Sequence, residues 1–187
     1  MKSHLQIRGL AEAAILIALA QLLSYVRLYH FPYGGSVDLA MLPIVIFCVR
    51  WGLRRGLLTG LVFGLLQYFI GLSASISWIS MLGDYALAYT AVGFAGLFYR
   101  RRQGVVWGSL SGSLARFAVH WVVGATVWGE YMPETFWNLP MTSTWLYSAL
   151  YNGSYMLPDC LLLMVVSAIL LRIMPRYMRG EDISRAQ

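Results

Sequence analysis

Five polar side chains fall inside apolar stretches of this 187-residue sequence, interleaved with tryptophan and tyrosine. They are Asp84, Arg116, His120, Asn152 and Asp159. Ionisable groups are costly in hydrocarbon, so inside membrane-spanning segments they usually face the bundle interior and mark a pathway or a ligand site. A carboxylate beside indole and phenol rings suits a small heteroaromatic cation, because ring stacking, cation–π attraction and hydrogen bonding act together.

The composition predicts that the elements positioning these residues are membrane helices. The chain is 59% hydrophobic and 12% charged, outside the range of soluble domains. About 20 apolar residues span a bilayer as a helix. We therefore predict an all-α integral membrane protein with a single domain over residues 1–187. Its six transmembrane helices form a compact bundle at residues 9–28, 38–50, 54–72, 77–98, 104–129 and 145–174.

The distribution of lysine and arginine predicts the orientation in the cell membrane. With six spans, Arg27 falls on one side and Arg116 lies mid-span. The other basic residues all fall on the opposite side: Lys2, Arg8, Arg50, Arg54, Arg55, Arg100, Arg101, Arg102, Arg172, Arg176, Arg179 and Arg185. By the positive-inside rule both termini are cytoplasmic. The net charge of +6 thus indicates topology and not a nucleic-acid partner.

Several functions are disfavoured by what the sequence lacks. Lys2 is the only lysine and no GxxxxGK[ST] run occurs, so ATP hydrolysis by a P-loop is excluded. Cys48 and Cys160 lie in separate apolar runs without CxxC spacing and are expected to be inert buried thiols. His4 and His30 are expected to lie far from the polar set, so we predict no metal site. The apolar N-terminal run lacks a signal-peptidase pattern and is interpreted as a retained helix.

Depth along the six spans predicts a pocket that opens outward. Asp84 lies about seven residues into its span, roughly 10 Å deep at 1.5 Å per residue. The residues at a similar depth are Asp38, Asp84, His120, Trp128, Tyr147 and Asn152. His120 and Trp128, eight residues apart, are expected on one helical face. Other readings stay open: Trp128 and Tyr147 also fit an interfacial aromatic belt, and Asn152 an interhelical hydrogen bond.

Two further patterns indicate helix packing. Arg116 and Asp159 lie deeper and at equal depth, which predicts an intramembrane ion pair between the fifth and sixth spans. Gly52, Gly56, Gly60 and Gly64 repeat every four residues and are expected to let the third span approach a neighbour closely.

Most of the chain, from about Glu12 to Leu170, resembles the thiamine-specific substrate-binding component (ThiT type) of energy-coupling factor transporters. The segments that carry the resemblance are YGGSVDLAMLPI, FCVRWGLRRGLLTGLVFGLLQ, GDYALAY, LARFAVHWVVGATVWGEY and WLYSALYNGSYMLPD. The resemblance implies a six-helix, non-catalytic binding subunit that captures thiamine from outside with high affinity. It also implies docking on a transmembrane coupling subunit and two cytoplasmic ATPase subunits, with no cofactor of its own.

The resemblance also assigns roles to residues. Asp84 takes the place of the family's acidic residue that bonds the aminopyrimidine, and Trp128 that of its ring-stacking tryptophan. The implied binding set is Asp84, Tyr85, His120, Trp128, Tyr147 and Asn152, to which depth alone adds Asp38. Ala14 and Ala18 match an alanine pair that packs on the coupling subunit, although internal packing explains them equally well.

The chain departs from some members of that family at three places. They have a tryptophan within the turn that here reads Tyr33, Gly34 and Gly35, His and Tyr where this chain has Leu72 and Ala74, and a glutamate at the position of Asp84. Three alternatives remain at this point. The chain is a component for another vitamin or a thiamine precursor, a membrane enzyme with Asp84 and His120 as acid and base, or a structural subunit whose polar residues only pack helices.

Overall fold

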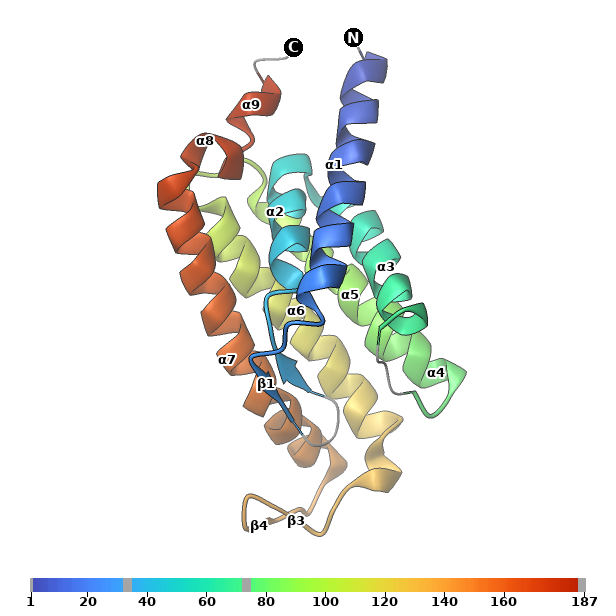
Figure 1. Ribbon diagram of the computed structural model, residues 1–187. Helices are drawn as coiled ribbons and strands as arrows, with labels where there is room; N and C mark the ends of the chain where they lie inside the picture. Colours follow the sequence, from blue (N-terminus) through green and yellow to red (C-terminus); the bar gives the residue numbers. More distant parts are fainter. Residues whose placement is uncertain (1, 32–34, 72–74, 185–187) are drawn as a thin grey trace.

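The computed structural model describes residues 2–31, 35–71 and 75–184, most of which are helical (Figure 1). The long helices are α1 (Lys2–Leu23), α2 (Met41–Trp51), α3 (Leu53–Phe69), α6 (Gly104–Thr126) and α7 (Thr144–Ile173). One further helical run consists of four short pieces: α4 (Trp78–Met81), the π-helix η1 (Leu82–Leu87), α5 (Ala88–Val92) and the 3₁₀-helix η2 (Gly93–Phe98). The short helices α8 (Pro175–Met178) and α9 (Glu181–Ser184) follow α7.

Two small antiparallel hairpins, which the sequence did not predict, interrupt the helical fold. In the first, β1 (Tyr29–His30) pairs with β2 (Ser36–Val37). After α6 and the 3₁₀-helix η3 (Gly129–Tyr131), the second pairs β3 (Thr135–Phe136) with β4 (Leu139–Pro140). The two residues between β3 and β4, Trp137 and Asn138, have positive φ angles of 52° and 61°. Positive φ at both turn positions is what a two-residue type I′ hairpin requires.

All six predicted spans correspond to helical segments, with different ends. α1 ends at Leu23, where the hydroxyl of Ser24 turns back to donate to the carbonyl of Gln21. α6 ends at Thr126, so Trp128 lies beyond the helix and the predicted shared helical face with His120 is wrong. Within the described residues, three helices are long and apolar enough to cross a membrane: His4–Leu23, Trp78–Phe98 and Thr144–Ile173.

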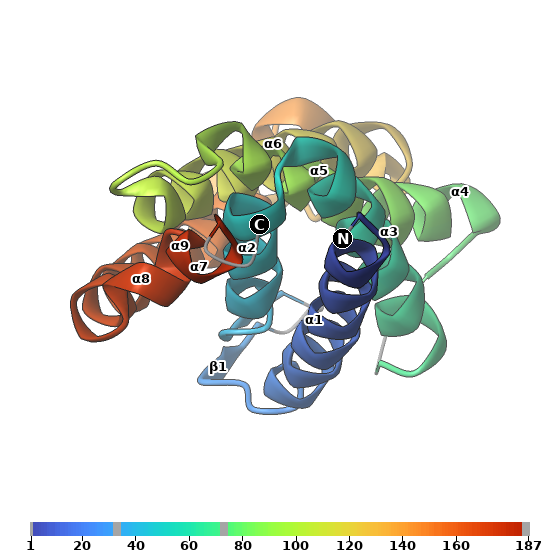
Figure 2. The same cartoon turned by 90° about the horizontal axis from the view of Figure 1, so that it is seen from above.

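The core forms around α2. All of its residues from Met41 to Arg50 are buried, as expected for a short helix that is apolar on every side. Seen from above, α2 lies between α1 and α7 (Figure 2). Both termini lie at the end of the molecule opposite β3 and β4 (Figure 1).

The glycine repeat lets α3 pack directly on the backbone of η1 and α5. A Cβ added at Gly60 would lie 2.2 Å from the Tyr89 carbonyl oxygen, and one at Gly64 would lie 2.3 Å from that of Tyr85. This confirms the predicted close approach. Because of this close approach, the π-helix η1, which contains Asp84, packs directly against α3.

A cluster of hydrogen-bonded charged and polar side chains connects residues near both ends of the chain. It is here named the Arg50 cluster and consists of Arg8, Glu12, Arg50, Tyr177 and Asp182. The Arg50 side chain is 0% exposed. Its Nε and Nη2 donate to the Glu12 carboxylate, Nη1 and Nη2 to Asp182 (2.9 and 3.0 Å), and Nη1 also to the Tyr177 carbonyl. The guanidinium also lies 3.6 Å from the centre of the Tyr177 ring, and Arg8 donates to Asp182 as well. A buried charge is tolerated when it is paired and hydrogen-bonded in this way.

The cluster shifts the acidity of Asp182 on α9. Partial burial opposes ionisation of its carboxyl, but hydrogen bonds from Arg50 and the charge of Arg50 outweigh that burial and lower the pKa of Asp182. A lowered folded-state pKa means that the carboxylate stabilises the fold above the ordinary aspartate pKa of about 3.9, and that this stabilisation is lost as pH falls through the folded value.

We expect Asp182→Asn to lower the unfolding temperature of the detergent-purified protein at pH 7, because Arg50 then stays buried with one carboxylate fewer. The difference from the wild type should begin to shrink as pH falls below about 3.9, where Asp182 is protonated in the unfolded state, and should vanish only below the lowered folded-state pKa, where it is protonated in both states. Glu181→Gln is the control: its carboxylate lies on the same helix, is 44% exposed and is 3.6 Å from Arg179, so its loss should change the unfolding temperature little. Equal effects of the two substitutions would contradict a specific role of Asp182.

Candidate ligand-binding site

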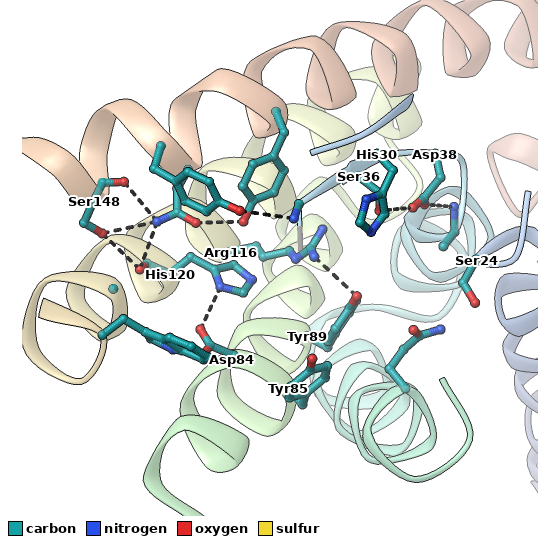
Figure 3. Close-up of a pocket in the computed structure, with 18 of the residues that line it drawn as sticks. Ser24, His30, Ser36, Asp38, Asp84, Tyr85, Tyr89, Arg116, His120 and Ser148 are labelled. Atoms are coloured by element: carbon teal, nitrogen blue, oxygen red, sulfur yellow. Dashed lines mark hydrogen bonds and ion pairs between the residues drawn. The ribbon is translucent and has the colours of Figure 1, made fainter. Parts of the chain in front are cut away.

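A cavity of about 460 Å³ lies among β1, β2, α3, η1, α5, α6, η3 and α7 (Figure 3). Its lining residues on α6 and α7 belong to the halves of these helices that adjoin the β3–β4 connection. This volume is within the usual range of small-molecule sites, about 300–1,000 Å³. Every residue that the sequence predicted to bind the ligand lines this cavity: Asp38, Asp84, Tyr85, His120, Trp128, Tyr147 and Asn152. The structure therefore brings together residues from distant parts of the chain.

The polar corner of the cavity is formed around Asp84. Its Oδ1 lies 2.9 Å from His120 Nδ1, and its Oδ2 accepts a 2.7 Å hydrogen bond from Trp128 Nε1 (Figure 3). Asp84 sits in the π-helix η1, and such local widening of a helix is frequent at functional sites. The indole N–H of Trp128 thus points at a half-buried carboxylate within the bundle.

His120 retains one unused polar atom. Its side chain is 11% exposed, and its Nε2 is buried without a hydrogen-bond partner among the described residues. A carboxylate accepts hydrogen bonds, so a neutral His120 that donates from Nδ1 to Asp84 presents Nε2 as an acceptor. This corner can therefore receive an N–H group from a ligand.

Asn152 links α6 and α7, which agrees with the interhelical hydrogen bond that the sequence analysis gave as its alternative role. Its side-chain amide donates to the carbonyls of Ser148 (2.9 Å) and His120 (3.4 Å), and its oxygen accepts from the Tyr155 hydroxyl at 2.7 Å. The residue is 5% exposed and still borders the cavity. Asn152 thus fixes the helix pair that carries His120.

One wall of the cavity is a row of tyrosines that sequence reasoning found only in part. Tyr147, Tyr151 and Tyr155 are four residues apart on α7, with neighbouring ring centres at 5.8 and 5.7 Å. All three line the cavity. Their spacing places them on one helical face, so this signal was available in the sequence once Tyr147 had been singled out.

The predicted ion pair between Arg116 and Asp159 is wrong: no salt bridge joins these two described side chains. Arg116 donates to the Tyr89 hydroxyl at 3.3 Å and to the Met41 sulfur at 3.1 Å, and its guanidinium lies 4.6 Å from the Tyr89 ring centre. Asp159 instead accepts from the backbone N–H of Asp38 at 3.0 Å. Equal depth does not fix the direction in which each helix presents its side chain, and the two residues face different neighbours.

The cavity also includes residues that the sequence analysis did not place there. His30, expected to be remote, borders it because the β1–β2 hairpin folds back beside α7. Other polar residues of the wall, missed by reasoning from span depth, are Ser24, Arg27, Ser36, Gln67, Tyr89 and Ser148. In the view of Figure 3, Arg116 lies between the Asp84–His120 corner and the side that His30 and Asp38 occupy. The departures at Tyr33, Gly34, Leu72 and Ala74 lie outside the described residues.

Comparison with known proteins decides the family. The family model described as "Thiamine transporter protein (Thia_YuaJ)" matches residues 10–179, which include every residue of the cavity. The chain belongs to the thiamine transporter family.

Relatives within this thiamine transporter family match the chain over nearly its whole length. It is 33% identical over 196 residues to the thiamine transporter ThiT of Bacillus subtilis, covering 97% of this chain and 99% of that protein. It is 28% identical to ThiT of Lacticaseibacillus paracasei, covering 97% and 96% respectively. A solved structure of ThiT from Listeria monocytogenes superposes with a TM-score of 0.81 at 25% identity, covering 92% of this chain and 98% of that one.

The contacts of Asp159 predict unequal effects of two substitutions. Asp159→Asn keeps an oxygen that can accept from the Asp38 N–H and should leave stability nearly unchanged, whereas Asp159→Ala removes that acceptor. Leaving a buried N–H unpaired costs about 1–3 kcal/mol, so the alanine variant should unfold at a lower temperature in detergent. If asparagine were as harmful as alanine, the charge of Asp159 and not its hydrogen bond would be what matters.

Proposed function

We propose that this chain is the thiamine-binding subunit of a membrane uptake transporter and has no catalytic activity of its own. The observation that carries the proposal is the Asp84 carboxylate, held between His120 and Trp128 in a ring-lined cavity of a thiamine transporter family member. Thiamine joins an aminopyrimidine to a thiazolium ring that carries a permanent positive charge. Both halves fit the chemistry of this cavity.

The charge of thiazolium must be stabilised when water is removed. Aromatic faces attract cations, and the walls supply those of Tyr85, Tyr147 and Tyr151. The aminopyrimidine suits the corner of Asp84 and His120, where the amino group can donate to the open Nε2. We assign Trp128 to stacking on a ligand ring, and Asp38, Tyr147 and Asn152 to the edge of the same site.

We infer that the protein crosses the cell membrane six times as one domain, with both termini in the cytoplasm. The six predicted ranges are helical, and both termini lie at the end opposite β3 and β4 (Figure 1). The positive-inside rule makes the end rich in arginine the cytoplasmic one, so the cavity opens toward the outside. Thiamine is then captured from the outside for import.

We propose an energy-coupling factor complex as the setting of this transport: a transmembrane coupling subunit and two cytoplasmic ATPase subunits. The sequence has no P-loop, so any ATP hydrolysis by such a motif would take place in partner chains. Ala14 and Ala18 lie exposed on α1 and give a helix surface of small residues for the coupling subunit. Thiamine is the proposed ligand, and neither a cofactor nor a metal is assigned.

Titration of the detergent-purified chain with thiamine, followed by tryptophan fluorescence, tests the proposed function. We expect saturable quenching at submicromolar ligand. Asp84→Asn and Trp128→Ala should each weaken binding more than tenfold, equivalent to about 1.4 kcal/mol, because each removes a partner of the polar corner. In Trp128→Phe the fluorescence change should be smaller, because the indole that reports binding is gone, whereas calorimetry should still detect binding.

A flat titration of folded wild-type protein would refute thiamine as the ligand. Competition with the pyrimidine half of thiamine and with riboflavin would then separate a precursor or another vitamin. Formation of a product from thiamine by the purified chain alone would favour an enzyme that uses Asp84 and His120 as acid and base.

The proposed partner surface has its own test. Ala14→Leu combined with Ala18→Leu should leave thiamine affinity unchanged and abolish thiamine uptake by cells that express the complete transporter, because leucine prevents close helix approach. Val165→Phe enlarges an exposed side chain on α7 and is the control, expected to keep both activities. Loss of binding together with uptake would mean that the alanine pair supports the fold instead.

A further inference from the structure

Phe136 of strand β3 lies against the tyrosine row from outside the cavity. Its ring centre is 5.6 Å from that of Tyr147 and 6.1 Å from that of Tyr151, with interplanar angles of 84° and 66°. These are edge-to-face arrangements, which aromatic pairs prefer at centroid distances of about 4.5–7 Å. Phe136 is half-buried and does not line the cavity, whereas both tyrosines do. It therefore supports the wall from behind.

The two tyrosines need such support because of where they lie. Tyr147 is in the first turn of α7, which begins at Thr144, and first turns fray more readily than helix centres. Its ring stacks on that of Tyr151 at 5.8 Å, and Tyr151 in turn contacts Tyr155 at 5.7 Å. The orientation of the Tyr147 ring therefore constrains that of Tyr151, and Tyr151 in turn constrains that of Tyr155.

The β3–β4 hairpin holds Phe136 in place. Phe136 is paired with Leu139, and the N–H of Met141 donates to the Glu134 carbonyl at 2.9 Å beside the hairpin. Trp137 adopts φ 52°, a value uncommon for bulky residues, and its ring stacks on Phe136 at 4.9 Å and 21°. Phe136 thus contacts Trp137 of its own hairpin as well as two tyrosines of α7.

We propose that Phe136 is a positioning residue for the ligand: it fixes the rings of Tyr147 and Tyr151 so that they face the cavity, without contacting the ligand itself. This inference rests on the proposed function, in which those rings contact an aromatic cation. Preorganised side chains lower the entropic cost of binding, and differences in affinity between related complexes appear mostly in the dissociation rate.

The test is stopped-flow fluorescence with thiamine on the purified full-length chain. Phe136→Ala should raise the dissociation constant about threefold to tenfold, mainly through faster dissociation, in line with the energy of aromatic pairs. Phe136→Tyr keeps the ring and should restore affinity to within about twofold of the wild type, whereas Phe136→Leu, which keeps most of the bulk without the ring, should not. Leu139→Ala removes an exposed apolar side chain from the same hairpin and is the matched control.

Two results would overturn the proposal: wild-type affinity in Phe136→Ala, or equal weakening in the tyrosine and alanine variants. If the alanine variant does not fold, the comparison of Phe136→Tyr with Phe136→Leu decides in the same way. Hydrogen exchange of residues 144–151 without ligand gives an independent reading, since loss of the ring should accelerate exchange there. Wild-type protein that fails to bind thiamine would refute the proposed function, and the exchange data would then decide on Phe136 alone.

Discussion

A carboxylate inside an apolar helix bundle needs hydrogen bonds from its neighbours, and the geometry of the cavity follows from meeting this need at Asp84. The donors come from two different elements: His120 from within α6 and Trp128 from the turn after it. The π-helix η1 presents the carboxylate, and the glycine face of α3 seats that helix. Helix packing and ligand chemistry are therefore linked at one side chain.

Arg116 and Asp159, two other charged residues of the predicted spans, are accommodated within the helix bundle in different ways. Arg116 lies over an aromatic ring and donates to a hydroxyl and a sulfur, and Asp159 accepts a backbone N–H. Neither residue has a partner of opposite charge at salt-bridge distance within the described chain. The cavity thus contains a positive group near its middle and a negative corner at one side (Figure 3).

Structural features that depend on the position of a residue along a helix could be predicted from the sequence. Those that depend on the rotation of a helix about its axis could not. Apolar runs predicted six ranges that are helical, with other ends, and residue depth predicted six of the residues that border the cavity; Tyr85 was added by the family resemblance. The pairing of Arg116 with Asp159 failed because depth leaves rotation undetermined. Trp128 was misplaced on a helix, and His30 was judged remote, because short turns and two-residue strands leave no periodic signal. The π-helix around Asp84 likewise has no signature in the hydrophobic pattern.

The Arg50 cluster has a consequence for how the chain is assembled. Arg50 lies at the end of the most deeply buried helix, yet Asp182, one of its two carboxylate partners, is separated from it by 132 positions in the sequence. While the chain is being synthesised, Glu12 is the only one of these carboxylates present, so the guanidinium cannot be neutralised from both sides until α9 has emerged. The contacts of Arg50 that hold α2 in its native position are therefore completed late, when the segment that follows α7 has been synthesised. Two residues of the Arg50 cluster, Arg8 and Asp182, lie outside the range matched by the family model.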